Sequence, residues 1–291
     1  MKSNLFKSLV IITLTAFAIG GLSQMSLAQG KNNIGLQLYS LRDDLNKDPK
    51  GTIEALGKIG YTFVEAANFE NGKFYGMSPE EFKALVEKNG MKFLSSHTGN
   101  DYEGNKASWD AAMTWWDQCI DAHKKAGCKF IIKPGMGDYA YGSLEGLKKT
   151  CEYFNAIGDK CNKAGIRFGY HNHTTEFKNI PGTDQIIYDY MLQNTDPAKV
   201  TFEMDTYWIH KGGKDPVEYF NKYPGRFELL HIKDTKELGG ATGEMDFKPI
   251  FENSKKAGTK LFIVENEEYD FPPLESVKKS LDFLNNAVYV K

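Results

Sequence analysis

Short apolar runs alternate with longer amphipathic segments from Asn32 to the end of the chain. A short apolar run bounded by turn residues predicts a buried strand, and apolar residues three or four positions apart predict a helix. The predicted strands cover 34–39, 61–66, 92–96, 129–133, a run that starts at 168, 200–205, 227–233 and 261–265. The predicted helices cover 49–59, 78–89, 106–126, 144–164, 216–223, 247–257 and 277–286.

We count eight strands alternating with eight helices, one of them without an assigned range, which is the pattern of a single (β/α)8 barrel, an α/β fold. A barrel of this kind needs about 250 residues. An open, doubly wound sheet is the main alternative, but the glycine fingerprint that follows the first strand of dinucleotide-binding sheets is missing. The two longest loops follow the fourth and seventh strands, and in a barrel both would lie on the catalytic face.

The N-terminus has the pattern of a secretory signal peptide. Lys2 and Lys7 flank an apolar stretch, 9–22, and Ser26 and Ala28 are small residues at a cleavage position. The stretch is shorter than the about 20 residues of a membrane span, although an uncleaved anchor helix is the alternative. Cleavage after residue 28 leaves 291 − 28 = 263 residues, 29–291, for the barrel. We therefore expect an exported, periplasmic protein without a membrane anchor.

Composition limits the partners of the chain. A formal net charge of −2 gives no reason to expect nucleic acid or an anionic membrane as a partner. The hydrophobic fraction of 41% is enough for a packed core. The four cysteines fall in two consecutive helical patterns, where buried free thiols are favoured over a disulfide between the helices. The oligomeric state is open, and a homo-oligomer is compatible with the sequence.

Ligand-type residues stand at the ends of the predicted strands. In a parallel barrel every strand points its C-terminal end at the same face, so these residues would surround one opening. They are Glu65, His97, Lys133, His171, His173, Asp205, His231 and Glu265. A single histidine at a strand end is more often structural, but the whole set predicts one divalent metal ion: Mn, Co, Zn or Mg.

The chain resembles the xylose isomerase-like sugar isomerase/epimerase barrels over essentially all of the predicted mature protein. The resemblance is carried by six segments: 34–42 (IGLQLYSLR), 170–177 (YHNHTTEF), 204–206 (MDT), 231–234 (HIKD), 243–247 (GEMDF) and 264–265 (VE). It implies a divalent ion held by Glu, Asp, His and Glu from the fifth to eighth strands. Asp205, His231 and Glu265 match three of these ligands. The fifth strand departs from the pattern, and either His173 or Glu176 is expected to fill the position, with a three-residue site plus water as the alternative.

The chemistry shared by the family is removal of a proton beside a carbonyl, with a metal stabilising the resulting oxyanion. Lys233 and Lys133 are candidates for the positive charge near that oxygen, and Glu265, Glu267 or His97 for the base. The residues expected to contact the substrate are His171, Trp208, Tyr39 and Glu65.

Exported relatives resemble 3-keto-glycoside lyases or hydratases, which implies a small carbohydrate as substrate. A carbonyl at C3 acidifies the proton at C2, and elimination then expels the substituent at C1. The favoured function is therefore this 1,2-elimination. Isomerisation or epimerisation of a free sugar is the first alternative, and a sugar-binding barrel without catalysis is the second.

Overall fold

The computed structural model describes residues 33–290. The predicted signal peptide, 1–28, lies outside the described residues. Within them no helix is long and apolar enough to span a membrane.

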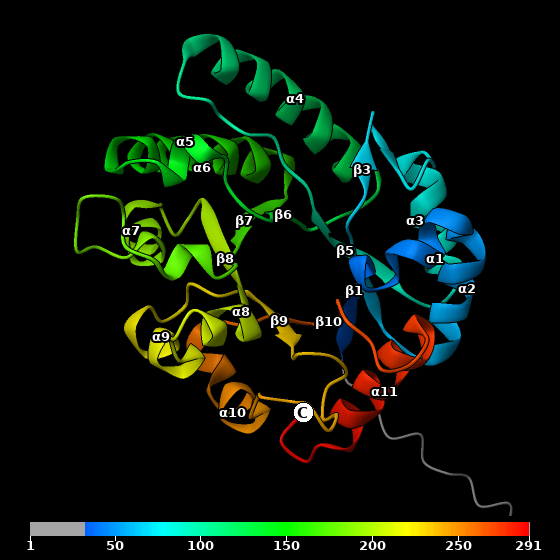
Figure 1. Cartoon of the computed structure of the whole chain (residues 1–291). Helices are drawn as coiled ribbons and strands as arrows, with labels where there is room; N and C mark the ends of the chain where they lie inside the picture. The colour runs from blue at the N-terminus through cyan, green and yellow to red at the C-terminus, as the bar shows by residue number, and fades with distance from the viewer. Residues whose placement is uncertain (1–32, 291) are drawn as a thin grey trace, which may run out of the picture. The chain divides into compact units, whose positions relative to one another are not determined.

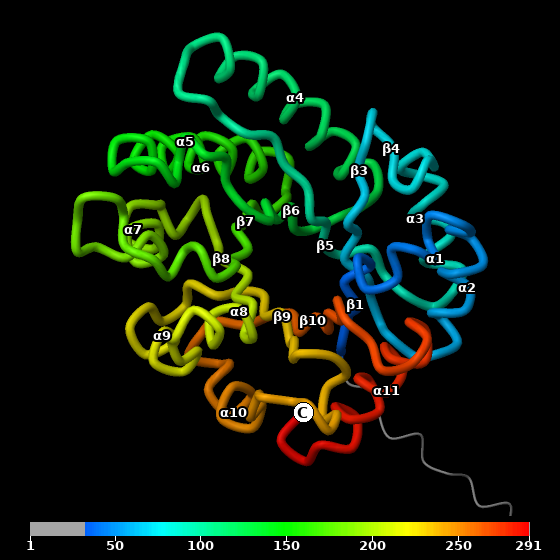
Figure 2. The backbone as a smooth tube through the Cα atoms, viewed as in Figure 1, coloured from blue at the N-terminus to red at the C-terminus, as the bar shows by residue number. Residues whose placement is uncertain are grey.

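Eight parallel strands form a closed barrel, with the helices arranged around it (Figure 1). The order around the barrel is β1-β10-β9-β8-β7-β6-β5-β2, so the first and last strands pair and close the ring. Figure 2 shows β1 and β10 side by side at this junction. The barrel strands are β1 (Ile34–Gln37), β2 (Phe63–Ala66), β5 (Lys92–His97), β6 (Phe130–Lys133), β7 (Arg167–His171), β8 (Val200–Asp205), β9 (Leu229–Lys233) and β10 (Leu261–Glu265). The predicted (β/α)8 barrel is confirmed.

The helices agree closely with the amphipathic segments of the sequence. They are α1 (Arg42–Lys47), α2 (Pro49–Ile59), α3 (Pro79–Lys88), α4 (Lys106–Lys125), α5 (Asp138–Tyr141), α6 (Leu144–Ala164), α7 (Ile187–Asn194), α8 (Thr206–Lys211), α9 (Pro216–Lys222), α10 (Phe247–Ala257) and α11 (Pro273–Asn286), with short 3-10 turns η1 (Leu38–Leu41) and η2 (Thr175–Phe177). Residues at the helix termini determine where several of these helices begin or end. Ser78 and Glu81 form a capping box at the start of α3, and Gly165 ends α6 in the left-handed conformation.

The structure differs from the prediction at the end of the first strand. This strand stops at Gln37 rather than Tyr39, because the Gln37 side chain accepts a hydrogen bond from the backbone N–H of Tyr39 (3.0 Å) and caps η1. Several further elements had no predicted range: the helices α1, α5, α7 and α8, the 3-10 turns η1 and η2, and a small hairpin. That hairpin pairs β3 (Phe69–Glu70) with β4 (Lys73–Phe74).

The barrel interior changes from apolar to polar along the strands. A cluster of Phe63, Phe130, Ile132, Leu229, Leu261 and Ile263 fills the end where the strands begin. Gly35 leaves room there, because a Cβ at this position would lie 2.1 Å from the Phe63 ring. Two residues after Phe63, Leu229 and Ile263 come Glu65, His231 and Glu265. Side chains alternate along a strand, so these polar groups point into the same interior, nearer the catalytic face.

All four cysteines, Cys119, Cys128, Cys151 and Cys161, are buried free thiols. This agrees with the favoured prediction and leaves the barrel without a disulfide.

Candidate metal centre

Four side chains from consecutive strands converge near the C-terminal mouth of the barrel. His171 ends β7, Asp205 ends β8, His231 lies in β9 and Glu265 ends β10. One ligand atom from each lies within 4.8 Å of all the others, and all four residues are buried. We call these four residues the metal group.

The metal group has nitrogen and oxygen atoms without hydrogen-bond partners, which could bind a cation. Among the described residues, both ring nitrogens of His171, Oδ2 of Asp205 and Nδ1 of His231 are buried and have no hydrogen-bond partner. Buried polar atoms are rarely left unsatisfied, so this cluster requires an explanation. The separations are 3.5 Å from His171 Nε2 to Asp205 Oδ2, 3.8 Å from His231 Nδ1 to Asp205 Oδ2 and 3.4 Å from His231 Nδ1 to Glu265 Oε2. Ligands about 2.0–2.2 Å from one tetrahedral ion lie about 3.3–3.6 Å apart. Two of the three separations lie in this range and the third, 3.8 Å, is slightly longer, so the residues present fit the ion.

Local contacts orient each member of this group. Asp205 caps α8, with Oδ1 accepting from the N–H groups of Tyr207 (2.9 Å) and Trp208 (2.8 Å), which leaves Oδ2 directed at the histidines. His231 Nε2 lies 2.7 Å from Glu65 Oε1, on the far side of the ring from the metal group. A carboxylate holding the outer nitrogen of a histidine is the usual support for a metal ligand.

The positions of His173 and Glu176 differ from the expectation. The Glu176 carboxylate accepts hydrogen bonds from Tyr141 Oη (2.7 Å), Tyr170 Oη (2.5 Å) and the N–H of His173 (2.9 Å). It is therefore used to hold the loop after β7. Neither residue belongs to the metal group, and His171 occupies the position at the end of the fifth barrel strand.

A second cluster of acids and histidines lies deeper in the barrel. His97 Nε2 lies 2.5 Å from Glu203 Oε2 and 3.2 Å from Glu65 Oε1. Glu65 also accepts from Gln37 (2.7 Å) and from Ser95. The 2.5 Å contact is a short hydrogen bond within this hydrogen-bonded network. With His171 and His231, His97 and Glu203 also form a second set whose ligand atoms lie within 4.8 Å of one another.

Burial and charge act in opposite directions on this network. Burial alone would raise the pKa of Glu65, but the charges of His97 and His231 lower it to about 2. Burial and the charge of Glu65 raise the pKa of Glu203 to about 7. Burial opposes protonation of His97, yet Glu65 and Glu203 raise its pKa above the ordinary value. Burial and Glu65 therefore favour the protonated form of Glu203, and the two carboxylates favour the protonated form of His97.

Glu203 is the residue of this network that the sequence reading missed. The available signal was its spacing: Glu203 lies two residues before Asp205 on β8, so both side chains point into the barrel. Glu65, expected to contact the substrate, is instead fully buried within the network.

The lysines and aromatic residues of the predicted site surround the mouth. Lys233 Nζ lies 3.1 Å from Glu265 Oε2 and 3.0 Å from Glu267 Oε1, and 5.4 Å from the centre of the Trp208 ring. Burial opposes its charge, but the carboxylates raise the pKa of Lys233 and keep it protonated. Lys133 is buried at the end of β6 and pairs with Asp101 (2.6 Å). Tyr39 lies at the rim, 45% exposed.

Comparison with known proteins confirms the resemblance carried by the motifs. The profile of the xylose isomerase-like TIM barrel family matches residues 53–287. Inosose dehydratase of Lacticaseibacillus casei is 28% identical over 281 residues, covering 82% of this chain and 89% of that protein. A sugar phosphate isomerase/epimerase of Parabacteroides distasonis superposes with a TM-score of 0.85 at 33% identity, covering 91% of this chain and 98% of that one. The 3-keto-D-glucoside 4-epimerase of E. coli shares the fold, with a TM-score of 0.68 at 17% identity over 88% of this chain and all (100%) of that one. The chain belongs to the xylose isomerase-like TIM barrel family.

Proposed function

We propose that this protein is a divalent-metal-dependent carbohydrate lyase or hydratase that performs a 1,2-elimination on a 3-keto-glycoside. The observation that carries the proposal is the metal group. Its buried, unpaired lone pairs lie on the face of the barrel where this fold places its chemistry.

A divalent ion held by His171, Asp205, His231 and Glu265 would act as a Lewis acid toward the carbonyl of the substrate. Lys233, kept charged by Glu265 and Glu267, adds a fixed positive charge where negative charge develops on the oxygen. The two ion pairs also hold the Lys233 side chain in one position, so its ammonium group need not move during the reaction.

His97 is the base that the geometry favours. His97 ends β5, its side chain is 9% exposed, and Glu203 holds its Nε2. Glu265 and Glu267, the alternative bases, are both paired with Lys233, and Glu265 also belongs to the metal group. In the elimination, the C2–H bond breaks and its proton passes to the base. The electron pair forms the C1–C2 double bond, the C1–O bond breaks, and the departing oxygen takes up a proton.

The relatives support the lyase reading. Inosose dehydratase eliminates water, and elimination beside a carbonyl begins with loss of the same kind of acidified proton. Isomerisation or epimerisation is the second candidate, supported by the name of the Parabacteroides protein at 33% identity. Both reactions begin with proton removal, so the fate of the C1 substituent separates them. The proposed export, based on residues 1–28, would bring the enzyme to glycosides outside the cytoplasm.

The test is incubation of a methyl 3-keto-glucoside with the purified protein in deuterated water. We expect release of methanol and exchange of deuterium at C2. Conversion of a free hexose to its ketose, with the keto-glycoside untouched, would support the isomerase instead. We expect Asp205→Asn to lose the bound ion and the activity. Asp215→Asn changes an exposed helix cap to an equivalent one and should retain both.

A further inference from the structure

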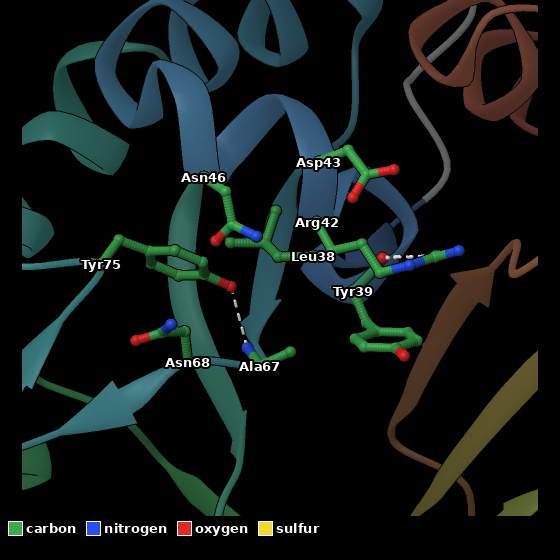
Figure 3. Close-up of a pocket in the computed structure, with 8 residues that line it drawn as sticks. All are labelled: Leu38, Tyr39, Arg42, Asp43, Asn46, Ala67, Asn68 and Tyr75. Atoms are coloured by element: carbon green, nitrogen blue, oxygen red, sulfur yellow. Dashed lines mark hydrogen bonds between the residues drawn. The ribbon is translucent and has the colours of Figure 1, made fainter.

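A polar groove lies on the rim of the barrel, beside the ends of β1 and β2. A cavity with a volume of about 210 Å³ is lined by Tyr39, Arg42, Asn46, Asn68 and Tyr75, among others (Figure 3). A second cavity of about 370 Å³ shares Asn46, Asn68 and Tyr75 and continues toward the β3–β4 hairpin. We call the two together the rim groove. Pockets for drug-sized ligands span about 300–1,000 Å³, so the first cavity accommodates a smaller, ring-sized unit.

The part of the groove that the two cavities share offers neutral hydrogen-bonding groups. Within residues 33–290 the amides of Asn46 and Asn68 have no side-chain hydrogen bond to another residue, so their donors and acceptors are available to a ligand. The ring of Tyr39 is 45% exposed and presents an apolar face. Amides beside an exposed aromatic ring fit a hydroxylated, uncharged unit.

An anionic ligand fits the groove less well. The Arg42 guanidinium donates to the backbone oxygen of Tyr39 (3.2 Å), to Tyr269 Oη (2.9 Å) and to the backbone oxygen of Glu267 (3.1 Å). Its N–H groups are therefore largely committed to the protein, and Asp43 adds a negative charge to the first cavity. Glu70 and Lys73 line the second cavity with opposite charges, so the groove has no net positive charge.

Tyr75 enters the groove from a strained backbone. Tyr75 (φ 50°) and Gly76 (φ 77°) form a two-residue turn between Phe74 and Met77, which exchange backbone hydrogen bonds of 3.0 and 2.9 Å. Such a turn favours Asn or Gly at its first position, as in the neighbouring Asn71–Gly72 turn. A bulky aromatic residue with positive φ is an outlier, and strained residues concentrate at functional sites.

The strain places the phenol of Tyr75 in the groove. Its oxygen accepts a hydrogen bond from the N–H of Ala67 (2.9 Å), as Figure 3 shows, and its ring lies 5.5 Å from that of Phe82. The phenolic proton stays available for a ligand oxygen, because the bond to Ala67 uses only a lone pair.

The rim groove is tied to the metal centre through Arg42. Arg42 binds the backbone of Glu267, and the carboxylate of Glu267 binds Lys233 at 3.0 Å, next to Glu265. In the described part of the chain, no residue of the metal group lines the groove. The groove is thus suited to a part of the substrate that extends away from the reacting atoms.

We propose that the rim groove binds the leaving group of the glycoside, and that this group is a hydroxylated unit such as a second sugar. The inference rests on the proposed function, since it assigns the groove to the same substrate. It makes a disaccharide-derived 3-keto-glycoside the preferred substrate over one with a small alkyl group.

The test compares two substrates that share the 3-keto-glucosyl unit and carry either methyl or glucosyl at C1. In Asn68→Ala and Tyr75→Asn we expect KM for the glucosyl substrate to rise about 3- to 10-fold, the effect of one or two lost hydrogen bonds, and KM for the methyl substrate to change less than about twofold. Asn194→Ala, an exposed asparagine at the end of α7, is the matched control and should leave both KM values unchanged. Circular dichroism checks that Tyr75→Asn remains folded, because Asn suits the turn but the substitution removes a ring packed against Phe82.

An equal rise in KM for both substrates, or no rise for either, overturns the assignment of the groove. If the wild-type protein turns over neither substrate, the proposed function has failed and the groove is tested by binding alone. Titration with cellobiose should then give an affinity that falls about 3- to 10-fold in Tyr75→Asn and Asn68→Ala. Cellobiose binding that is absent, or unchanged in both variants, would refute the groove independently of catalysis.

Discussion

Glu65→Gln separates the support of the metal centre from the centre itself. Glu65 is fully buried and is not itself a member of the metal group. It contacts that group through His231, whose Nε2 lies 2.7 Å from Glu65 Oε1. The carboxylate accepts the Nε2 proton and so leaves Nδ1, which faces Asp205 and Glu265, free to bind a cation. Glutamine has nearly the same shape but only one acceptor oxygen.

The structure indicates how large the effect should be. Glu65 accepts hydrogen bonds from Gln37 Nε2, Ser95 Oγ and His231 Nε2. An amide cannot accept all three, and its NH2 group would face another donor. Loss of such a partner typically lowers metal affinity 10- to 100-fold, or about 1.4–2.7 kcal/mol. We therefore expect Glu65→Gln to bind Mn2+ or Zn2+ within that range more weakly than the wild type, with the barrel still folded.

Competition titration against a metal chelator measures the affinity, and circular dichroism checks the fold. Glu228→Gln is the matched control, because Glu228 pairs with Arg167 and Lys260 where their strands begin, at the opposite end of the barrel. It should lose some stability and keep its metal affinity. A folded Glu65→Gln protein with wild-type metal affinity would refute the proposed role of Glu65.

Two further predictions concern other histidines. His171→Ala should abolish binding of the ion, whereas His173→Ala should retain about one ion per chain by elemental analysis; the reverse pattern would return His173 to the metal group. His123 is packed against Phe69 and Phe74, and burial lowers its pKa to about 4. Because the unfolded chain binds this proton near pH 6.5, stability contributed by neutral His123 is present above pH 6.5 and is lost as the pH falls toward 4, by about 3 kcal/mol. Denaturant unfolding of His123→Met should show a pH dependence smaller by that amount over this interval, and an unchanged slope would contradict the reasoning.

The sequence predicted the barrel because its signals are local and repeated. Each strand of the ring is a short apolar run, and helices α2, α6 and α10 begin and end at the predicted residues. Their ends are set by neighbouring residues, such as Gly165 and Gly258 in the left-handed conformation. The conformation of Tyr75 could not be anticipated in this way, because it opposes the turn preference of its own residue type.

The sequence was enough to predict which strands carry the candidate site and on which face of the barrel it lies. It was less able to predict which residues form the site. The sequence places His171, His173 and Glu176 within six residues, and each is a suitable ligand. Only the structure shows that the hydroxyls of Tyr141 and Tyr170, one of them distant in sequence, occupy the Glu176 carboxylate. The hydrogen-bonded network of Glu65, His97 and Glu203 likewise depends on how far the strands are staggered around the ring, and a single strand does not contain that information.

The pairing of β1 with β10 has a consequence for how the protein folds. The metal group comes from four consecutive strands, β7 to β10, so it can assemble within the C-terminal part of the chain. The rim groove requires β1 and β2, and it joins that part only through contacts such as Asn266 to Ser40 and Arg42 to Glu267, which are more than 220 residues apart in sequence. Contacts of such long range close large loops and form late in folding. The rim groove therefore requires the closed ring, and so does the full support of the metal group, because Glu65 on β2 holds the outer nitrogen of His231.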